Sequence, residues 1–380
     1  MATYVSPLSG RPLVADTSHS LADGEGERWP VVDGIAYLRV GREALVATVL
    51  ERLDAGDRRG ALIRLLADQD DWWSGPPADP QRLGALVDGA GHISFRAAMD
   101  LLSFGRVGDY FAHRWSDPTY LAALALMEAH WCEPSTAFEL ACGAGHYLRE
   151  LVRRGVACAG ADVVFAKLWL ARHWIAGPDV ELACFDAATP WPIASDDFDL
   201  VLCHDALYFL EPKSEIVARL RGLAAAGGLL AIAHVHNRGY PNLSPGAAVT
   251  GAELAGLFPG AIVYDDAELT RALVERRAPR PASWASLGQA EAFSLVESEH
   301  PTPRALVEGL TVPPPDADLV RNPLYGADDR VVWPSERYRE EYARRATYPL
   351  RSNAPERARR TASTEPMARS RELVDLPERW

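Results

Sequence analysis

The chain has 380 residues, 48% of them hydrophobic, which is enough for one catalytic domain with substantial additions. Its formal net charge of -13 argues against nonspecific binding to nucleic acid or to an anionic membrane, since both require a basic face. The five cysteines contain no Cys-x-x-Cys pair, and no apolar run approaches the roughly 18 residues of a membrane span. The chain also begins without the basic and apolar regions of a secretory signal. We therefore expect a cytoplasmic protein without a disulfide framework.

Residues 1–40 are rich in turns and resemble a small zinc-ribbon module that has lost its metal. In such a module a Cys-Pro-x-Cys turn precedes an Asp-Gly-Ile strand. Here Ser6 and Ser9 stand where the cysteines would be, and Asp33-Gly34-Ile35 follows. Because serine is a poor zinc ligand, we expect no zinc in this module and predict a role in packing or in docking a partner.

Residues 41–131 are predicted to form a block of helices, because apolar residues recur three to four positions apart. Leu62, Leu65 and Leu66 illustrate this spacing. A break rich in glycine and proline at 75–80 divides the block into two parts.

The middle of the chain alternates strands with helical stretches. The predicted strands are 136–138, 156–161, 180–185, 198–203, 229–233, 261–264 and 292–296. Such alternation predicts an α/β protein with a doubly wound, mostly parallel sheet of seven strands. Ligands of such sheets bind at the carboxyl ends of the strands, so the residues that follow each strand are the candidates for a site.

The turn after the first of these strands favours a ligand with a cationic group. Glu139 ends the strand, and Gly143 and Gly145 precede the next helix, where they let backbone N–H groups approach a ligand. Dinucleotide-binding turns have the same architecture, but they need a third glycine or alanine where this chain has Leu148. An acid at Glu139 would also repel a pyrophosphate. A nicotinamide dehydrogenase is therefore the less favoured alternative.

Polar residues follow the next four strands as well. An acid at the tip of the second strand is placed to accept both hydroxyls of a ribose. The residues are Asp162 after the second strand, Asp186 and Ala187 after the third, His204 and Asp205 after the fourth, and His234 and His236 after the fifth.

With these motifs, residues from about 110 to 297 resemble a class I S-adenosylmethionine-dependent methyltransferase, whose fold is Rossmann-like. The first motif of that family, an acid followed by Gly-x-Gly, corresponds to Glu139, Gly143 and Gly145, with Ala141 where many members carry another glycine. The resemblance implies S-adenosylmethionine as cofactor. It also implies the following contacts: Glu139, Ala141, Gly143 and Gly145 along the methionine part, Asp162 at the ribose, Asp186 and Ala187 at the adenine, His204 beside the methyl group and Arg114 at the carboxylate.

The sequence defines the methyl acceptor and the general base less closely. Members of the family that methylate nucleobase or glutamine nitrogens usually carry Asn/Asp-Pro-Pro-Tyr/Phe at the fourth strand, where this chain has His-Asp-Ala-Leu-Tyr at 204–208. We therefore expect a small-molecule acceptor, with oxygen favoured over nitrogen or carbon, and no nucleic acid. The candidate bases are His204, His234 and His236. No metal is predicted, because the histidines lack an evident third ligand, although Asp205 is a candidate.

The resemblance divides the chain into four parts. We predict a zinc-ribbon-like module at 1–40, a helical lid over cofactor and substrate at 41–131, the S-adenosylmethionine-binding domain at 132–297 and a C-terminal extension at 298–380. In the extension Ser335 is expected to cap a helix, residues 351–360 to form a solvated mobile segment, and the apolar residues at the end of the chain to dock elsewhere.

A second function remains open. The zinc-ribbon-like module is associated, in relatives, with the activation of a partner enzyme. The chain is therefore alternatively a non-catalytic S-adenosylmethionine-binding subunit. A homodimer, or a protein partner bound through residues 1–40, is expected on the same ground.

Overall fold

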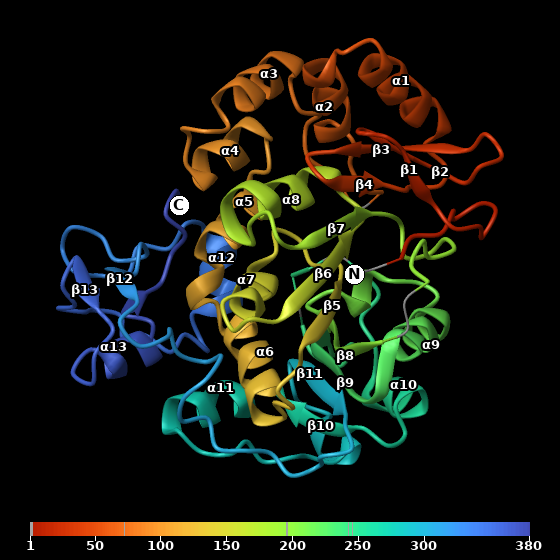
Figure 1. The fold of residues 1–380 in the computed structure, drawn as a ribbon. Coiled ribbons are helices and arrows are strands. Elements are labelled where there is room, and N and C mark those ends of the chain that lie inside the picture. The colour runs from red at the N-terminus through yellow and green to blue at the C-terminus, as the bar shows by residue number, and fades with distance from the viewer. Residues whose placement is uncertain (1–2, 72, 195–196, 242, 245) are drawn as a thin grey trace.

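The computed structural model describes residues 3–71, 73–194, 197–241, 243–244 and 246–380. Its centre is an eleven-stranded sheet (Figure 1). Seven strands come from the alternating part of the chain: β5 (Thr136–Leu140), β6 (Ala157–Asp162), β7 (Glu181–Cys184), β8 (Phe198–His204), β9 (Ala224–His236), β10 (Ile262–Asp265) and β11 (Ala292–Glu297). Their order is β7-β6-β5-β8-β9-β11-β10, and only β11 runs antiparallel to its neighbours among these described strands. The predicted doubly wound, mostly parallel sheet is confirmed.

The N-terminal module continues this sheet beyond the seven predicted strands. It contributes β1 (Val14–Thr17), β2 (Ser20–Ala22), β3 (Arg28–Val32) and β4 (Ile35–Tyr37). Strand β4 pairs in parallel with β7, with Ile35 opposite Leu182 and Tyr37 opposite Cys184 (Figure 1). The pairing covers the edge of β7, whose backbone N–H and C=O groups would otherwise be unpaired. The sheet therefore has eleven strands where the sequence predicted seven.

The predicted helical block forms six α-helices between the N-terminal strands and β5. They are α1 (Glu43–Asp54), α2 (Arg58–Leu66), α3 (Pro80–Gly89), α4 (Phe95–Leu101), α5 (Arg106–His113) and α6 (Pro118–Ala129). The helices that alternate with the strands of the sheet are α7 (His146–Val152), α8 (Phe165–Leu170), α9 (Lys213–Leu223), α10 (Gly251–Leu257) and α11 (Asp266–Glu275). No helix within the described ranges is long and apolar enough to cross a bilayer.

Helix α6 is buried along its whole length. It begins with Asp117, whose carboxylate accepts a hydrogen bond from the Thr119 N–H at 2.7 Å, and with Pro118, whose ring suits the first turn. Because its residues are apolar on every side, it packs at once against β9, β11 and α11. Helix α6 therefore connects the lid to the sheet.

The C-terminal extension forms a small separate sheet and two helices, one of which returns to the centre. Its elements are β12 (Asp318–Arg321), α12 (Glu336–Tyr342), β13 (Arg357–Arg359), α13 (Glu365–Arg369) and β14 (Leu373–Val374). Ser335 caps α12 as predicted, accepting from the Tyr338 N–H at 3.2 Å. The prediction of a mobile segment at 351–360 is wrong, because Arg357–Arg359 pairs with β12.

The end of the chain docks against the helical block. The indole Nε1 of Trp380 donates to the carbonyl of Ala112 at 2.7 Å, and Arg379 donates to the carbonyl of His173 at 2.6 Å. The carbonyl of Arg379 in turn accepts from the Phe95 N–H at 2.6 Å. The last two residues therefore connect α4 and α5 to the segment after α8, as the apolar end of the sequence predicted.

The turn between β3 and β4 is tied to the sheet domain by one carboxylate. Asp33 accepts hydrogen bonds from Trp169 at 2.7 Å and from His173 at 2.8 Å, and it also pairs with Arg58. Burial would raise the pKa of Asp33, but the hydrogen bonds from His173, Trp169 and Arg58 outweigh it and hold the pKa below the usual range. This carboxylate therefore stabilises the folded state when it is ionised.

We expect Asp33→Asn to lower the free energy of unfolding by about 1.5 to 3 kcal/mol at pH 7, because it removes charge-assisted hydrogen bonds. Since the folded pKa is depressed, the wild-type advantage is present above the unfolded pKa of about 3.9 and shrinks as the pH falls below it. Urea denaturation at pH 7 and at lower pH measures both effects. Asp71→Asn, whose side chain is 92% exposed, is the control. Equal stability of the two variants at pH 7 would contradict the expectation.

Candidate functional site

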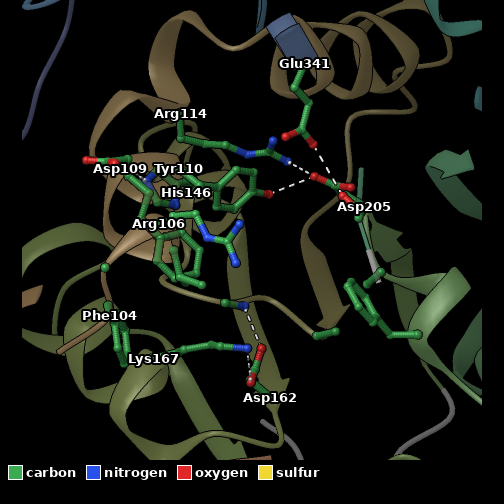
Figure 2. Close-up of a pocket in the computed structure, with 18 of the residues that line it drawn as sticks. Phe104, Arg106, Asp109, Tyr110, Arg114, His146, Asp162, Lys167, Asp205 and Glu341 are labelled. Carbon is green, nitrogen blue, oxygen red and sulfur yellow. Dashed lines mark hydrogen bonds and ion pairs between the residues drawn. The ribbon is translucent and has the colours of Figure 1, made fainter. Parts of the chain in front are cut away.

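A cavity of about 590 Å³ opens at the carboxyl ends of β5, β6 and β8. Three regions that are distant in sequence build its wall: the loops and helix α5 of the lid, the strand ends, and helix α12 of the C-terminal extension (Figure 2). The sequence-predicted residues that line it are Arg114, Glu139, Ala141, Gly143, Asp162, His204 and His234.

Glu139, at the end of β5, is 1% exposed. Its Oε2 has no hydrogen-bond partner within the described part of the chain. Burial raises the pKa of Glu139 well above its usual range, the guanidinium of Arg114 opposes the rise, and Asp162 adds to it. An unpartnered carboxylate in such a setting favours a ligand that brings a positive charge or a hydrogen-bond donor.

Asp162 joins the loops after β5 and β6. One carboxylate oxygen accepts from the Gly143 N–H at 3.0 Å, and the other accepts from the Val164 N–H at 2.9 Å and lies 3.5 Å from the Lys167 ammonium (Figure 2). A carboxylate offers about four lone-pair sites, so these contacts leave acceptor positions for the hydroxyls of a ligand.

The turn after β5 uses left-handed backbone at three positions. Ala141 has φ +56°, Gly143 φ +55° and Gly145 φ +78°. Ala141 and Gly143 line the cavity, whereas Gly145 does not. A Cβ on Gly145 would lie 3.0 Å from the Cβ of Ala171, so this glycine lets α7 pack closely on a neighbouring helix.

Asp186 and Ala187 are not among the described residues that line the cavity, so their contact with an adenine stays a prediction. The Asp186 carboxylate accepts from the Ala188 N–H at 2.9 Å, and the Ala187 carbonyl accepts from Trp191 Nε1 at 2.9 Å. The N-terminal module continues beside the end of β7. There the Leu38 N–H donates to the carbonyl of Cys184 at 2.7 Å.

Arg114 lies in the cavity wall, but protein groups already engage both of its terminal nitrogens. Nη1 donates to Asp117 at 2.9 Å, and Nη2 donates to the Tyr147 hydroxyl at 2.9 Å and lies 3.2 Å from Asp205. The structure therefore makes Arg114 a support of the site. Arg106 also lies in the cavity wall (Figure 2). Unlike the other arginines and the lysine of that wall, it has no carboxylate of a described residue within ion-pair distance.

His204 is buried at the end of β8. Its Nδ1 accepts a hydrogen bond from the Ala233 N–H at 3.2 Å, so the neutral ring carries its proton on Nε2, which has no partner among the described residues. Burial and the nearby Arg114 lower the pKa of His204 to about 3. The ring can therefore donate a hydrogen bond from Nε2, but it is poorly suited to accept a proton.

His234 and His236 end β9 and meet Asp205 at the other end of the cavity. His234 Nδ1 pairs with Asp266, and its Nε2 lies 4.0 Å from Asp205 Oδ1. The second Asp205 oxygen accepts from the Tyr110 hydroxyl at 2.8 Å. Burial would lower the pKa of His234, but Asp266 and Asp205 outweigh it and raise the pKa. Burial and His234 lower the pKa of His236 to about 3.

The sequence analysis missed several residues of the site. Asp266, fully buried at the start of α11, holds His234, and Glu341 of α12 lines the cavity beside Asp205 (Figure 2). Lys167, which pairs with Asp162, is one of only two lysines in the chain, and this rarity was the available signal. Glu341 carried no signal, because it lies outside the segment that resembles a known family.

Comparison with known proteins assigns the domain that forms the strand ends of this cavity. Residues 138–232 match the family model described as a methyltransferase domain. The chain contains a methyltransferase domain. The mostly parallel sheet and the motif residues Glu139, Gly143 and Gly145 fit the resemblance to class I S-adenosylmethionine-dependent methyltransferases. The search of curated proteins found no match.

Solved structures share part of the fold. The complex between the Haloferax volcanii Trm112 methyltransferase activator and a methyltransferase is 19% identical, covers 54% of this chain and 96% of that one, and has a TM-score of 0.40. Haemonchus contortus phosphoethanolamine N-methyltransferase 2 with S-adenosylmethionine is 17% identical over 49% of each chain, with a TM-score of 0.37. An S-adenosylmethionine-dependent methyltransferase from Mesorhizobium loti is 19% identical, covers 47% of this chain and 96% of that one, and has a TM-score of 0.34. Because these structures match only about half of this chain, with TM-scores of 0.40 or lower, they say nothing about the methyl acceptor.

The residues of the methyltransferase domain fit the cofactor that the family uses. S-adenosylmethionine carries a sulfonium and an amino group, and the unpartnered Glu139 carboxylate and Asp162 lie where positive charge would be stabilised. Between them, Gly143 presents backbone without a side chain to the cavity. A Cβ at this position would lie only 3.2 Å from the Phe111 ring. Outside the matched segment, the guanidinium of Arg106 lies in the same cavity wall.

We expect Gly143→Ala to weaken binding of S-adenosylhomocysteine by at least about tenfold, or ~1.4 kcal/mol. The added Cβ would press on Phe111 and strain a left-handed residue at the cavity wall. Isothermal titration calorimetry measures the change. Gly155→Ala is the matched control, because Gly155 also has a positive φ of +78° but has nothing within 4 Å of the added Cβ. Unchanged affinity of Gly143→Ala would show that the turn does not contact the cofactor.

Proposed function

We propose that this chain transfers a methyl group from S-adenosylmethionine to an oxygen of a small molecule. The observation that supports the proposal is that Glu139 and Asp162, at one end of the cavity, share it with Asp205 and His234 at the other end. One cavity therefore offers groups suited to the cofactor and separate groups suited to an acceptor.

The cofactor end is formed by the loops after β5 and β6. In the proposal Glu139 and the turn at Ala141 and Gly143 lie along the methionine part, and Asp162 accepts from the ribose hydroxyls. Arg106 takes the role at the cofactor carboxylate that the sequence had assigned to Arg114, because the latter is already engaged by Asp117 and Asp205.

The acceptor end combines aromatic walls with hydroxyl and carboxylate groups. Tyr208 donates to Asp205 at 2.9 Å, and Tyr338, Glu341 and Tyr342 close the cavity from α12. A cavity of about 590 Å³ enclosed in this way suits a small polar or aromatic molecule. The negative net charge and the closing helix both disfavour a nucleic acid.

Methyl transfer forms a bond between the acceptor oxygen and the methyl carbon while the bond from that carbon to sulfur breaks and leaves a thioether. The residues of this chain contribute chiefly by holding the two reactants in line, which supplies effective molarities of about 10⁵ to 10⁸ M. In the proposal, His204 donates a hydrogen bond from Nε2, and His234 with Asp205, which line the same cavity, takes up the proton that the acceptor loses. Helix α12 and the lid exclude water.

The alternative of a non-catalytic subunit is less well supported. Strand β4 of the N-terminal module is used within the chain, where it pairs with β7, and is therefore not free to dock a partner. The exposed edge strand β1 of the module remains available for pairing with a second copy of the chain or with another protein.

We expect Asp162→Ala to weaken S-adenosylhomocysteine binding by about 1.5 to 3 kcal/mol, through loss of charge-assisted hydrogen bonds. Asp186→Ala should leave the affinity unchanged, because the Asp186 carboxylate lies outside the cavity. Calorimetry on both variants, with melting temperatures to confirm folding, makes the comparison. A loss of affinity in Asp186→Ala alone would restore the original adenine assignment and contradict the site described here.

The reaction itself is tested by incubating the protein and S-adenosylmethionine with a deuterated methyl group in fractionated metabolite extracts. We expect mass spectrometry to find a product heavier by one labelled methyl, attached to oxygen and absent when Glu139→Gln replaces the wild type. Label found only on nitrogen or carbon would overturn the oxygen assignment. Cofactor binding without any labelled product would favour the non-catalytic alternative.

A further inference from the structure

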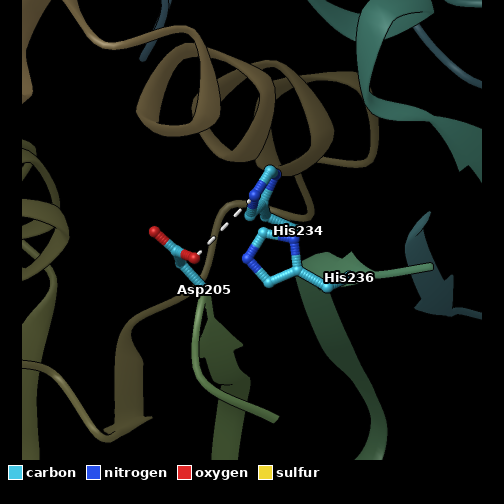
Figure 3. A group of neighbouring side chains, drawn as sticks. All are labelled: Asp205, His234 and His236. Atoms are coloured by element: carbon cyan, nitrogen blue, oxygen red, sulfur yellow. Dashed lines mark ion pairs between the residues drawn. The ribbon is translucent and has the colours of Figure 1, made fainter. Parts of the chain in front are cut away.

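Three potential metal ligands converge at the acceptor end of the cavity. Asp205 follows β8, while His234 and His236 lie two positions apart at the end of β9 and so point to one face of the strand. One ligand atom from each lies within 4.8 Å of the others (Figure 3). Within the described ranges, no other group of three such residues comes together in this way.

The orientation of His234 turns Nε2 toward Asp205. The ionised Asp266 can only accept, so His234 Nδ1 carries the proton that binds it, and a metal ion that displaces the proton of Nε2 finds the lone pair there. That atom lies 4.0 Å from Asp205 Oδ1, which is too long for a hydrogen bond. Two ligand atoms at about 2.0 to 2.2 Å from a tetrahedral zinc ion lie about 3.4 Å apart, so binding would draw these two atoms slightly together. A carboxylate that orients a histidine through its other nitrogen is typical of metal sites.

His236 supplies an independent observation. It is 4% exposed, and its Nδ1 has no hydrogen-bond partner in the described part of the chain. No hydrogen bond to either ring nitrogen holds it in place there, and Figure 3 shows the ring turned toward Asp205 and His234. A buried imidazole without a partner costs free energy unless a ligand satisfies it.

The charges and the backbone around the cluster fit a cation. Four carboxylates that are buried or line the cavity, from Asp117, Asp205, Asp266 and Glu341, are accompanied by three guanidinium groups, from Arg114, Arg337 and Arg345. Asp205 and His234 also have positive φ values of +53° and +56°, which are strained for residues other than glycine. Strain of this kind is concentrated at functional sites.

We propose that Asp205, His234 and His236 bind one divalent transition-metal ion, with Asp266 orienting His234. Two imidazoles and one carboxylate suit Zn²⁺, Fe²⁺, Co²⁺ or Ni²⁺ rather than Mg²⁺ or Ca²⁺, which prefer oxygen ligands. Because Asp205 and His234 line the cavity, the open coordination positions face it. The role of the ion rests on the proposed function: an acceptor hydroxyl bound to it is oriented toward the methyl group and loses its proton more readily.

The test measures metal binding directly, on the full chain treated with a chelator and then dialysed. We expect calorimetry with Zn²⁺ to give one site, and Co²⁺ to produce visible absorption bands from nitrogen and oxygen ligands. His236→Gln should weaken Zn²⁺ binding by at least about tenfold without loss of folding, because its ring makes no hydrogen bond that the change would break. Asp205→Asn should have the same effect on binding.

His113→Gln is the matched control, since His113 is also buried with an unpartnered ring nitrogen but belongs to no group of three potential ligands among the described residues. Zn²⁺ affinity should be retained there. Absence of stoichiometric binding by folded wild type, or equal affinity in wild type and His236→Gln, overturns the proposal. Titration of the same samples with S-adenosylhomocysteine separates the two hypotheses: metal binding without cofactor binding refutes the proposed function and leaves the site intact.

Discussion

The buried guanidinium of Arg114 is the charge on which the cavity depends. It is 3% exposed and contacts Asp117, which is fully buried, and Asp205. Removing such charges from water costs several kcal/mol each, and this cost is offset only when the partners and their hydrogen bonds are all in place. Because Asp117 caps the start of α6 and Asp205 directly follows β8, the ion pairs fix the lid relative to the sheet. The position of Asp205 at the acceptor end follows from this arrangement.

The same network separates the cavity into two ends with different chemistry. At the cofactor end, Glu139 keeps an oxygen without a partner and Asp162 holds the bare turn at Gly143. At the acceptor end, Asp205 is held by Tyr110, Tyr208 and Arg114. Carboxylates that are well supplied with donors stay ionised, whereas a buried one without donors favours a cationic ligand. The two ends of the cavity therefore favour different ligands.

Both termini of the chain take part in this construction. The N-terminal strands extend the sheet past β7, and they place the Leu38 N–H against Cys184 where the sequence had expected Asp186 and Ala187 to face an adenine. The C-terminal extension brings α12 over the cavity and docks Trp380 on α5. Contacts of this kind join residues more than 100 positions apart, and no local pattern in the sequence encodes them.

The sequence alone determined the seven central strands and the carboxyl edge at which the site lies, because periodic apolar runs and a turn with two glycines are local signals. It also identified Glu139, Gly143, Asp162, His204 and His234 as residues of that edge. Only the tertiary structure decided that Arg114 is engaged by acids, that Asp186 lies outside the cavity, and that Asp266 and Glu341 belong to the site. Burial, ion pairing and the packing of distant segments set these outcomes, and each depends on neighbours that the chain acquires only when it folds.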